Sequence, residues 1–347
     1  MTNFVKNAWY VAGWSTEIDD ELRRFTILGE HVVMFRKSDG SVAALEDRCP
    51  HRLLPLSKGK RIGDTVQCGY HGLTYGPDGK CIAIPGQTQL PPGAQVRTYP
   101  LVERWKWLWI WMGDPALADE SEIPNLYWHD DPDWTMVMGY LTIDAHYQLL
   151  VDNLLDLTHE TFLHASTIGN AAVADAASVR TLKENDSVTV ARWTIGNNPP
   201  PTYQKMAGWD TNIIVDRWQI IQFRMPGAVR LFTGAAPGAA EGQEFGFTDL
   251  ERDTPANGFG FKNLNFVTPE TETSTHYFWS NAYQVVGKPV DPELTELSFQ
   301  QIFQAFHQDW EVFDLQQENQ DDRPVIDTNQ DAGALAARAM IDRDIAA

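Results

Sequence analysis

Short apolar runs separated by turn residues fill the first third of the chain. Gly29, Asp39-Gly40 and Asp78-Gly79 lie between runs rich in β-branched and aromatic residues, a pattern typical of strands joined by tight turns. This part of the chain is therefore predicted to be all-β. The expected strands include residues 9–12, 24–28, 31–35 and 42–45.

Four tryptophans stand at every second position from Trp105 to Trp111. This spacing places them on one face of an expected strand. A stacking platform for nucleic-acid bases would also use aromatic side chains. Because the formal net charge is -20, buried packing within a sheet is the favoured interpretation.

A stretch rich in proline and acidic residues, 113–133, separates this region from the rest. It is predicted to link two domains, 1–120 and 121–347. Beyond it the hydrophobic pattern predicts a helix, a long strand-rich region and two further helices. These segments are about 148–164, 179–280, 292–320 and 332–345. The fold class predicted is α+β, with the all-β part first.

Composition narrows the class of protein. The 347 residues are 43% hydrophobic and 21% charged, which suits two globular domains with sizeable cores. The acidic charge argues against nucleic acid or an anionic membrane as a general partner. The sequence shows neither an apolar stretch of membrane-spanning length nor the features of a secretory signal, so a cytoplasmic location is expected. Three cysteines argue against a disulfide framework.

Two short motifs pair a cysteine with a histidine: Cys49-Pro-His51 and Cys68-Gly-Tyr-His71. Two thiolates and two imidazoles on separate loops are the ligands of a Rieske [2Fe–2S] centre. The alternative is a zinc site, but the order C-x-H then C-x-x-H differs from that of a zinc finger. Cys81 has no second partner nearby and is expected to be a buried small residue.

The residues around the first motif, 48–61, include five basic side chains and no acid. They could form a docking surface for an acidic electron donor. A solvated surface loop is an equally good interpretation.

A second constellation contains Asp156, His159 and His164. Two histidines and a carboxylate are the ligand set of non-haem Fe(II) oxygenases. Asp156 and His159 share one helix face, whereas His159 and His164 would be separated by about 140° on an ideal helix. Both histidines can therefore reach one iron only if the helix ends or bulges between them. The carboxylate ligand could then come from elsewhere.

These motifs, C-P-H-x16-C-G-Y-H-G and D-x2-H-x4-H, resemble those of the Rieske non-haem iron oxygenases, in their large subunit. The resemblance implies a Rieske domain at 1–120 and, at 121–347, a catalytic domain whose antiparallel sheet is flanked by helices. It also implies that His159 and His164 bind iron and that Asp156 links a ligand histidine to His71 of a neighbouring subunit. A ring-shaped homotrimer would follow.

The same resemblance points to further residues. The third iron ligand would be an aspartate in the late helix, and Asp309 is the choice over Glu311 and Asp314. Asn153 would lie near the iron, and Pro85 would belong to a loop that covers the cluster.

A finer resemblance, to vanillate O-demethylase and dicamba monooxygenase oxygenase subunits, covers nearly the whole chain. It rests on residues 7–12, 150–154 and 268–279. It implies O2-dependent demethylation of a methoxylated aromatic acid, with vanillate converted to protocatechuate and formaldehyde as the specific case. Because no Gly-x-Gly-x-x-Gly fingerprint is present, NAD(P)H would act only through a separate ferredoxin or flavin reductase.

Other functions remain open at this stage. The motifs do not distinguish an O-methyl substrate from an aryl N-methyl or C-methyl one. A Rieske electron carrier without catalysis is disfavoured by the second domain and its ligand set. An aromatic carboxylate needs a cationic or multiply hydrogen-bonding partner, and four residues of the second domain are candidates. They are His276 and Arg217, which we favour, together with Arg224 and Arg230.

Overall fold

The computed structural model describes residues 3–169, 173, 178–241, 250, 254–284, 291–321 and 323–346. The chain forms two compact units. The N-terminal unit comprises Phe4–Asn125 and Thr268–Thr271, and the C-terminal unit comprises Leu126–Val267 and Glu272–Ala347 together with Met1–Asn3. The fold class predicted from the sequence, α+β with the all-β part first, is confirmed.

The N-terminal unit contains three small antiparallel sheets with strand orders β1-β10-β9, β2-β3-β4 and β5-β6-β7-β8. The strands are β1 (Trp9–Trp14), β2 (Arg23–Ile27), β3 (Glu30–Arg36), β4 (Val42–Glu46), β5 (Lys60–Ile62), β6 (Thr65–Gln67), β7 (Thr74–Tyr75), β8 (Cys81–Ala83), β9 (Leu101–Arg104) and β10 (Trp107–Trp111). Phe35, Leu45 and Val66 belong to a core that also contains Cys49 and Cys68. Apolar packing therefore surrounds both cysteine positions.

The tryptophan-rich segment differs in part from the prediction. Trp107, Trp109 and Trp111 lie in β10 and are buried, as expected. Trp105, however, lies in the turn before the strand, where it and Lys106 have positive φ angles of 58° and 67°. The turn between β9 and β10 requires this left-handed backbone, and the alternation of side chains therefore begins only at Trp107.

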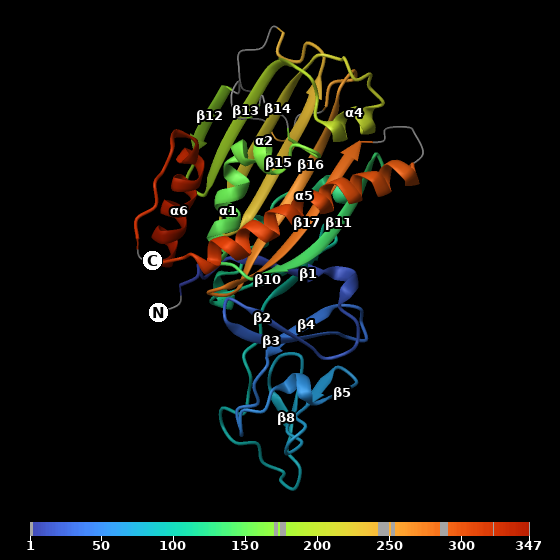
Figure 1. Cartoon of the computed structure of the whole chain (residues 1–347). Helices are drawn as coiled ribbons and strands as arrows, with labels where there is room; N and C mark the ends of the chain where they lie inside the picture. Colours follow the sequence, from blue (N-terminus) through green and yellow to red (C-terminus); the bar gives the residue numbers. More distant parts are fainter. Residues whose placement is uncertain are drawn as a thin grey trace. The chain divides into compact units, whose positions relative to one another are not determined.

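The C-terminal unit is built on one seven-stranded sheet of order β11-β17-β16-β15-β14-β13-β12 (Figure 1). Its strands are β11 (Trp134–Ile143), β12 (Ser178–Lys183), β13 (Ser187–Asn197), β14 (Val215–Arg224), β15 (Ala228–Ala236), β16 (Phe259–Thr271) and β17 (Ser274–Gln284). Long neighbouring strands with nearly continuous burial, such as β14 and β15, indicate that both faces are covered at the centre of the sheet.

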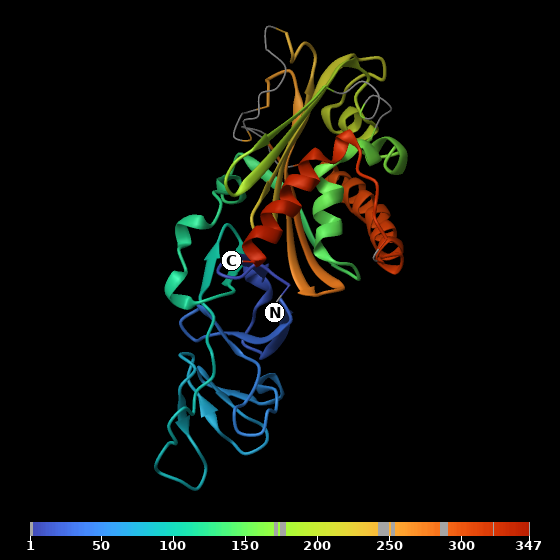
Figure 2. The ribbon, with the colours of Figure 1, turned by 90° about the vertical axis from the view of Figure 1, so that its left-hand side faces the viewer.

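Helices of the C-terminal unit gather on one side of this sheet (Figure 2). They include α1 (Tyr147–Leu155), α2 (Glu160–Leu163), α4 (Pro201–Ala207), α5 (Pro292–Glu318) and α6 (Ala332–Ile345). On α5, Phe306 contacts the rings of Tyr277 and Trp279 of β17. The long helix is thereby held across the sheet by aromatic packing.

The two late helices lie where the sequence predicted them, whereas α4 was not predicted. It begins at Pro201, inside the region 179–280 that the sequence predicted to be strand-rich. Proline is well tolerated at the first helical position because its missing N–H has no intrahelical partner there. Gly208, at φ 65°, ends the helix in the left-handed conformation.

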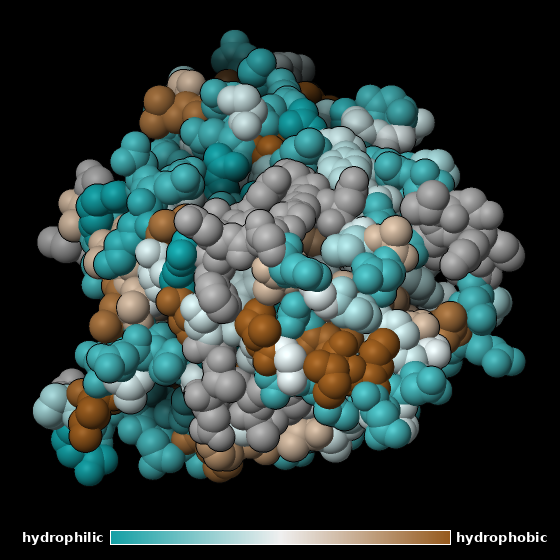
Figure 3. Space-filling model, turned by 90° about the horizontal axis from the view of Figure 1, so that it is seen from above, coloured by the Kyte–Doolittle hydropathy of each residue, from teal (hydrophilic) through white to brown (hydrophobic). Residues whose placement is uncertain are grey.

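The side of the molecule shown in Figure 3 carries mainly hydrophilic residues, with hydrophobic residues in small groups. None of the helices in the described part of the chain combines the length and the apolar character needed to span a membrane.

Candidate metal centres

The first centre lies in two tight loops of the N-terminal unit. The backbone N–H of Leu53 donates to the carbonyl of Cys49 at 2.9 Å, and that of Gly72 donates to the carbonyl of Cys68 at 3.1 Å. The two cysteines are buried, whereas His51 and His71 are exposed. The two imidazole rings lie 4.5 Å apart between centroids. The loops thus present thiols on the inner side and imidazoles on the outer side.

This donor set fits a [2Fe–2S] cluster with two sulfur and two nitrogen ligands. A cavity next to the loops is lined by His51, His71 and Pro85. Gly72, at φ 74°, leaves room for Pro85, because a Cβ there would lie 2.8 Å from the proline Cγ. The segment that contains Pro85 therefore packs directly against the second cysteine–histidine loop.

Tyr75 is a residue of this centre that sequence reasoning missed. Its hydroxyl lies 3.3 Å from the Sγ of Cys49, and burial raises its pKa, so it stays protonated and can donate to the sulfur. Hydrogen bonds to cluster sulfurs are one of the means by which proteins tune reduction potential. The only signal available in the sequence was its position four residues after His71.

The second centre begins where a helix breaks. α1 ends at Leu155, a 3-10 turn covers Leu157–His159, and α2 ends at Leu163. His164 follows with non-helical φ and ψ angles of -111° and 22°. The break removes the 140° offset of an unbroken helix, as the spacing of the two histidines required.

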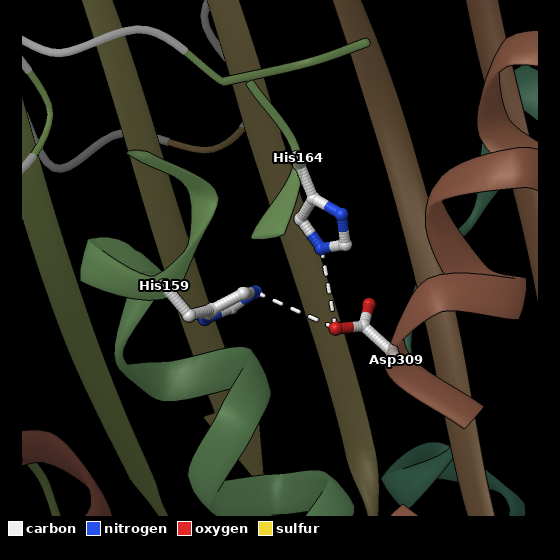
Figure 4. Close-up of side chains that lie close together, drawn as sticks. All are labelled: His159, His164 and Asp309. Atoms are coloured by element: carbon white, nitrogen blue, oxygen red, sulfur yellow. Dashed lines mark hydrogen bonds and ion pairs between the residues drawn. The ribbon is translucent and has the colours of Figure 1, made fainter. Parts of the chain in front are cut away.

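His159, His164 and Asp309 meet across this break (Figure 4). Each offers a ligand atom, and these atoms all lie within 4.8 Å of one another. The Nε2 of His164 is 3.2 Å, and that of His159 is 3.7 Å, from Oδ1 of Asp309. Asp309 and His164 are buried, and His159 is partly exposed. Two imidazoles and one carboxylate facing one point match the facial ligand set of non-haem iron.

Hydrogen bonds orient both histidines for this task. The Nδ1 of His159 lies 2.7 Å from the backbone carbonyl of Asp156, and the Nδ1 of His164 lies 2.9 Å from Oε1 of Gln308. Each acceptor favours the tautomer with the proton on Nδ1, which leaves Nε2 able to bind a metal. Burial lowers the pKa of His164, but hydrogen bonding and charge from Asp309, together with Gln308, raise it overall.

The carboxylate is also held in place. Nδ2 of Asn153 donates to Oδ1 of Asp309 at 3.2 Å, so Asn153 lies beside the triad. Of the two competing acids on α5, Glu311 is exposed, and Asp314 is not part of the group that could hold a metal among the described residues.

Asp156 lies beside the triad, but the contacts of its carboxylate are not those predicted from the sequence. Its carboxylate accepts hydrogen bonds from the backbone and hydroxyl of Thr158 at 2.9 Å and lies 3.5 Å from Nη2 of Arg192. Its contact with His159 is made by the backbone carbonyl and not by the carboxylate. Arg192 is almost fully buried, and its pairing with an acid far away in the sequence was not foreseen.

A cavity extends from the triad toward the sheet. Its apolar wall includes Leu157, Ile302 and Phe306, and its polar wall includes Arg217 and Gln219. The polar wall therefore contains Arg217, one of the two residues that we favoured for substrate binding.

His276, the other favoured residue, is absent from the described lining of this cavity. Tyr277 points toward α5, where it contacts Phe306, so the adjacent His276 points to the opposite face of β17. There its Nδ1 lies 2.7 Å from the hydroxyl of Tyr140. The structure does not bring His276 to the iron site, because a strand alternates its side chains between two faces.

Comparison with known protein families shows the family to which the chain belongs. Residues 8–100 match the Rieske [2Fe-2S] domain, and residues 143–347 match the vanillate O-demethylase oxygenase C-terminal domain. The chain belongs to the Rieske non-haem iron oxygenases. A [2Fe–2S] cluster and a mononuclear non-haem iron are the cofactors of this Rieske oxygenase.

Individual relatives of this Rieske oxygenase have different substrates in their names. This chain is 39% identical to the toluene-4-sulfonate monooxygenase system iron-sulfur subunit TsaM1 of Comamonas testosteroni, over 98% of this chain and 96% of the relative. It is 38% identical to the vanillate O-demethylase oxygenase subunit of Pseudomonas sp. strain HR199, over 99% and 96%. Dicamba monooxygenase bound to 3,6-dichlorosalicylic acid superposes with a TM-score of 0.87 at 31% identity, covering 99% of this chain and 98% of that one.

Gln308 offers a direct test of how the Rieske oxygenase holds its second metal. We expect Gln308→Leu to weaken iron retention about 10- to 100-fold, because outer partners of ligand histidines typically contribute that much to metal affinity. Iron content after dialysis against a graded series of chelator concentrations measures the change, and the cluster absorbance should not move. Gln304→Leu, at an exposed position one turn earlier on α5, is the matched control. Equal iron retention in the two variants would show that Gln308 does not support the ligand.

Proposed function

We propose that this Rieske oxygenase removes the methyl group of a methoxylated aromatic acid, with vanillate converted to protocatechuate and formaldehyde as the specific case. The observation that carries the proposal is one cavity lined both by His159, His164 and Asp309 and by the polar wall with Arg217. A relative of nearly the same length is named as a vanillate O-demethylase oxygenase subunit, and a related structure holds 3,6-dichlorosalicylic acid.

In this proposal Cys49, Cys68, His51 and His71 hold the [2Fe–2S] cluster. His159, His164 and Asp309 hold the mononuclear iron, with Asn153 and Gln308 orienting Asp309 and His164. When bound, the cluster stores one electron, and the iron supplies the centre at which O2 is activated. Hydroxylation of the methoxy C–H bond yields a hemiacetal, which collapses to a phenol and formaldehyde.

The protein's own contribution is placement and the exclusion of water. Leu157, Ile302 and Phe306 form an apolar wall next to the triad, which suits the ring of an aromatic substrate. The polar wall on the sheet would fix the end of the ring that carries the acid. An aromatic acid held between the two walls would present only one substituent to the metal.

A second candidate reaction is hydroxylation of a methyl group attached directly to the ring. It is favoured by the relative named as a subunit of a toluene-4-sulfonate monooxygenase system, at 39% identity over almost the entire chain. The same cavity would serve, with a sulfonate in place of the carboxylate.

Electrons must reach the cluster from outside the chain. We infer a separate ferredoxin or flavin reductase that draws on NAD(P)H, since several relatives are named as oxygenase components or subunits of systems. The exposed histidines and the neighbouring exposed Arg48, Arg52 and Lys58 offer a basic surface for an acidic donor. We also propose a homotrimer in which Asp156 links His71 of one subunit to the iron site of the next.

A panel of aromatic acids tests the proposed function. The loaded enzyme, a reductase and NAD(P)H would be supplied in turn with vanillate, 4-methoxybenzoate and toluene-4-sulfonate, with formaldehyde and hydroxymethyl products measured. We expect formaldehyde in equal amount to the phenol formed from vanillate. Hydroxymethyl product from the sulfonate alone would favour the second reaction, and no oxygenated product from any of the three would refute the proposal.

A further inference from the structure

Arg217 is a buried cation on the wall of the catalytic cavity. It is the third residue of β14, opposite Ala235 of β15 and Thr194 of β13, and only 3% of its surface is exposed. Its Nη2 lies 3.1 Å from Oε2 of Glu160. Its Nη1 and Nε are buried and have no hydrogen-bond acceptor among the described residues.

Such unpaired donors are costly inside a protein. A buried polar group without a partner loses its hydrogen bonds to water and gains nothing in return, and the loss is larger when the group is charged. Nη1 carries two N–H groups, and both are left without an acceptor when Glu160 occupies Nη2. An acceptor from outside the chain would remove this cost.

The surroundings hold the guanidinium in one place. Glu160 also accepts from Nε2 of Gln219, at 2.8 Å and 2.9 Å to its two oxygens, and Gln219 shares the face of β14 with Arg217. The ring of Tyr203 lies 5.3 Å from the guanidinium carbon. Glu160 is the residue directly after the triad's His159. The arginine is therefore positioned by residues of the same cavity wall.

The charges of the cavity favour an anion. Asp309 and Glu160 each contribute one negative charge to its lining and Arg217 one positive charge. Iron(II) at the triad would add two positive charges, which leaves the lining with one positive charge in total. A ligand with a single negative charge would neutralise it, whereas a neutral ligand would not.

We propose that Arg217 binds the carboxylate or sulfonate of the aromatic substrate through Nη1, while Glu160 and Gln219 hold its guanidinium in position. This inference rests on the proposed function, because it concerns the substrate of the same cavity. It makes Arg217 a specificity-determining residue. The enzyme would select substrates by their anionic group, whichever methyl group is then oxidised.

The test compares each acid with a neutral partner of similar shape. Dissociation constants of the fully loaded enzyme would be measured for vanillate and vanillamide, and for toluene-4-sulfonate and toluene-4-sulfonamide. We expect the wild type to prefer the acids. In Arg217→Gln the affinity for the acids should fall about 30-fold or more, since a charge-assisted hydrogen bond in a buried site is lost. The affinity for the amides should change less than about threefold.

Two further variants keep the test decisive. The double variant Arg217→Gln with Glu160→Gln avoids an unpaired buried carboxylate and serves if the single variant does not fold. Arg224→Gln, on the same strand but at the surface in an ion pair with Asp186, is the matched control and should bind all four ligands as the wild type does. The acid that loses more affinity in the Arg217 variants identifies the carboxylate or the sulfonate as the group recognised.

Equal losses for acids and amides in the Arg217 variants would overturn the inference, because the arginine would then support the cavity without recognising charge. Acid binding that survives in those variants would overturn it as well. Both outcomes leave the oxygenation reaction standing if the wild type still oxidises the panel. A wild type that oxidises none of the acids would instead refute the proposed function.

Discussion

Replacing His159 by alanine is expected to abolish turnover while the [2Fe–2S] spectrum stays unchanged. His159 offers one of the three ligand atoms of the second centre and stands outside both cysteine–histidine motifs of the first. Loss of an outer partner alone typically lowers metal affinity or activity about 10- to 100-fold, so the loss of a ligand should exceed about 100-fold. Product formation, iron content and the electron paramagnetic resonance signal of the reduced cluster would be measured on the same preparation.

The control for this variant is His307→Ala. His307 is an exposed histidine on α5 whose ring contacts Phe303 and Trp310, and its removal should leave both metals and turnover in place. If His159→Ala retained more than about a tenth of the wild-type rate, His159 would not be an iron ligand. A simultaneous loss of the cluster signal would point to general unfolding and would also count against the assignment.

The second large effect is expected from Asp156→Asn. The proposed trimer sends electrons through Asp156, and asparagine would remove the charge while preserving shape. Because the backbone carbonyl of Asp156, and not its carboxylate, accepts the Nδ1 proton of His159, iron should stay bound. We expect the cluster of the pre-reduced variant to be oxidised about 10- to 100-fold more slowly in the presence of substrate and O2. Stopped-flow absorbance of the cluster measures this rate in a single turnover.

Asp144→Asn, at an exposed position before α1, serves as the control for a change of charge alone. Cluster oxidation at the wild-type rate in Asp156→Asn would contradict the linking role. Loss of iron in that variant would contradict it too, since the carboxylate would then be part of the iron site. Because the carboxylate of Asp156 also pairs with Arg192 at 3.5 Å, a modest loss of stability in Asp156→Asn would count neither for nor against the linking role.

Some features were predictable because they depend on residues close together in the chain. The cysteine–histidine loops, the pair His159 and His164, and the helices α5 and α6 all follow from local spacing and hydrophobic period. Even the break in the helix before His164 followed from the angle between the two histidines.

Other features depend on which face of an element meets the site. His276 and Arg217 were predicted on equal grounds, yet only Arg217 lines the cavity. A strand turns successive side chains to opposite faces, so a shift of one position decides the outcome. Gln308 shows the same limit on a helix, because its contact with His164 depends on how α5 is rotated against the break.

The sequence by itself determined the type of chemistry, since most of the metal-binding residues stand in three short pairs, Cys49 with His51, Cys68 with His71, and His159 with His164. Only the tertiary structure brought Asp309 to His164, 145 positions earlier in the chain, and paired Arg217 with Glu160 on the wall of the cavity. The reason is physical. The distance between residues far apart in sequence is set by the packing of α5 and β14 into one unit, and the hydrophobic pattern that drives this packing does not record which polar side chains will meet.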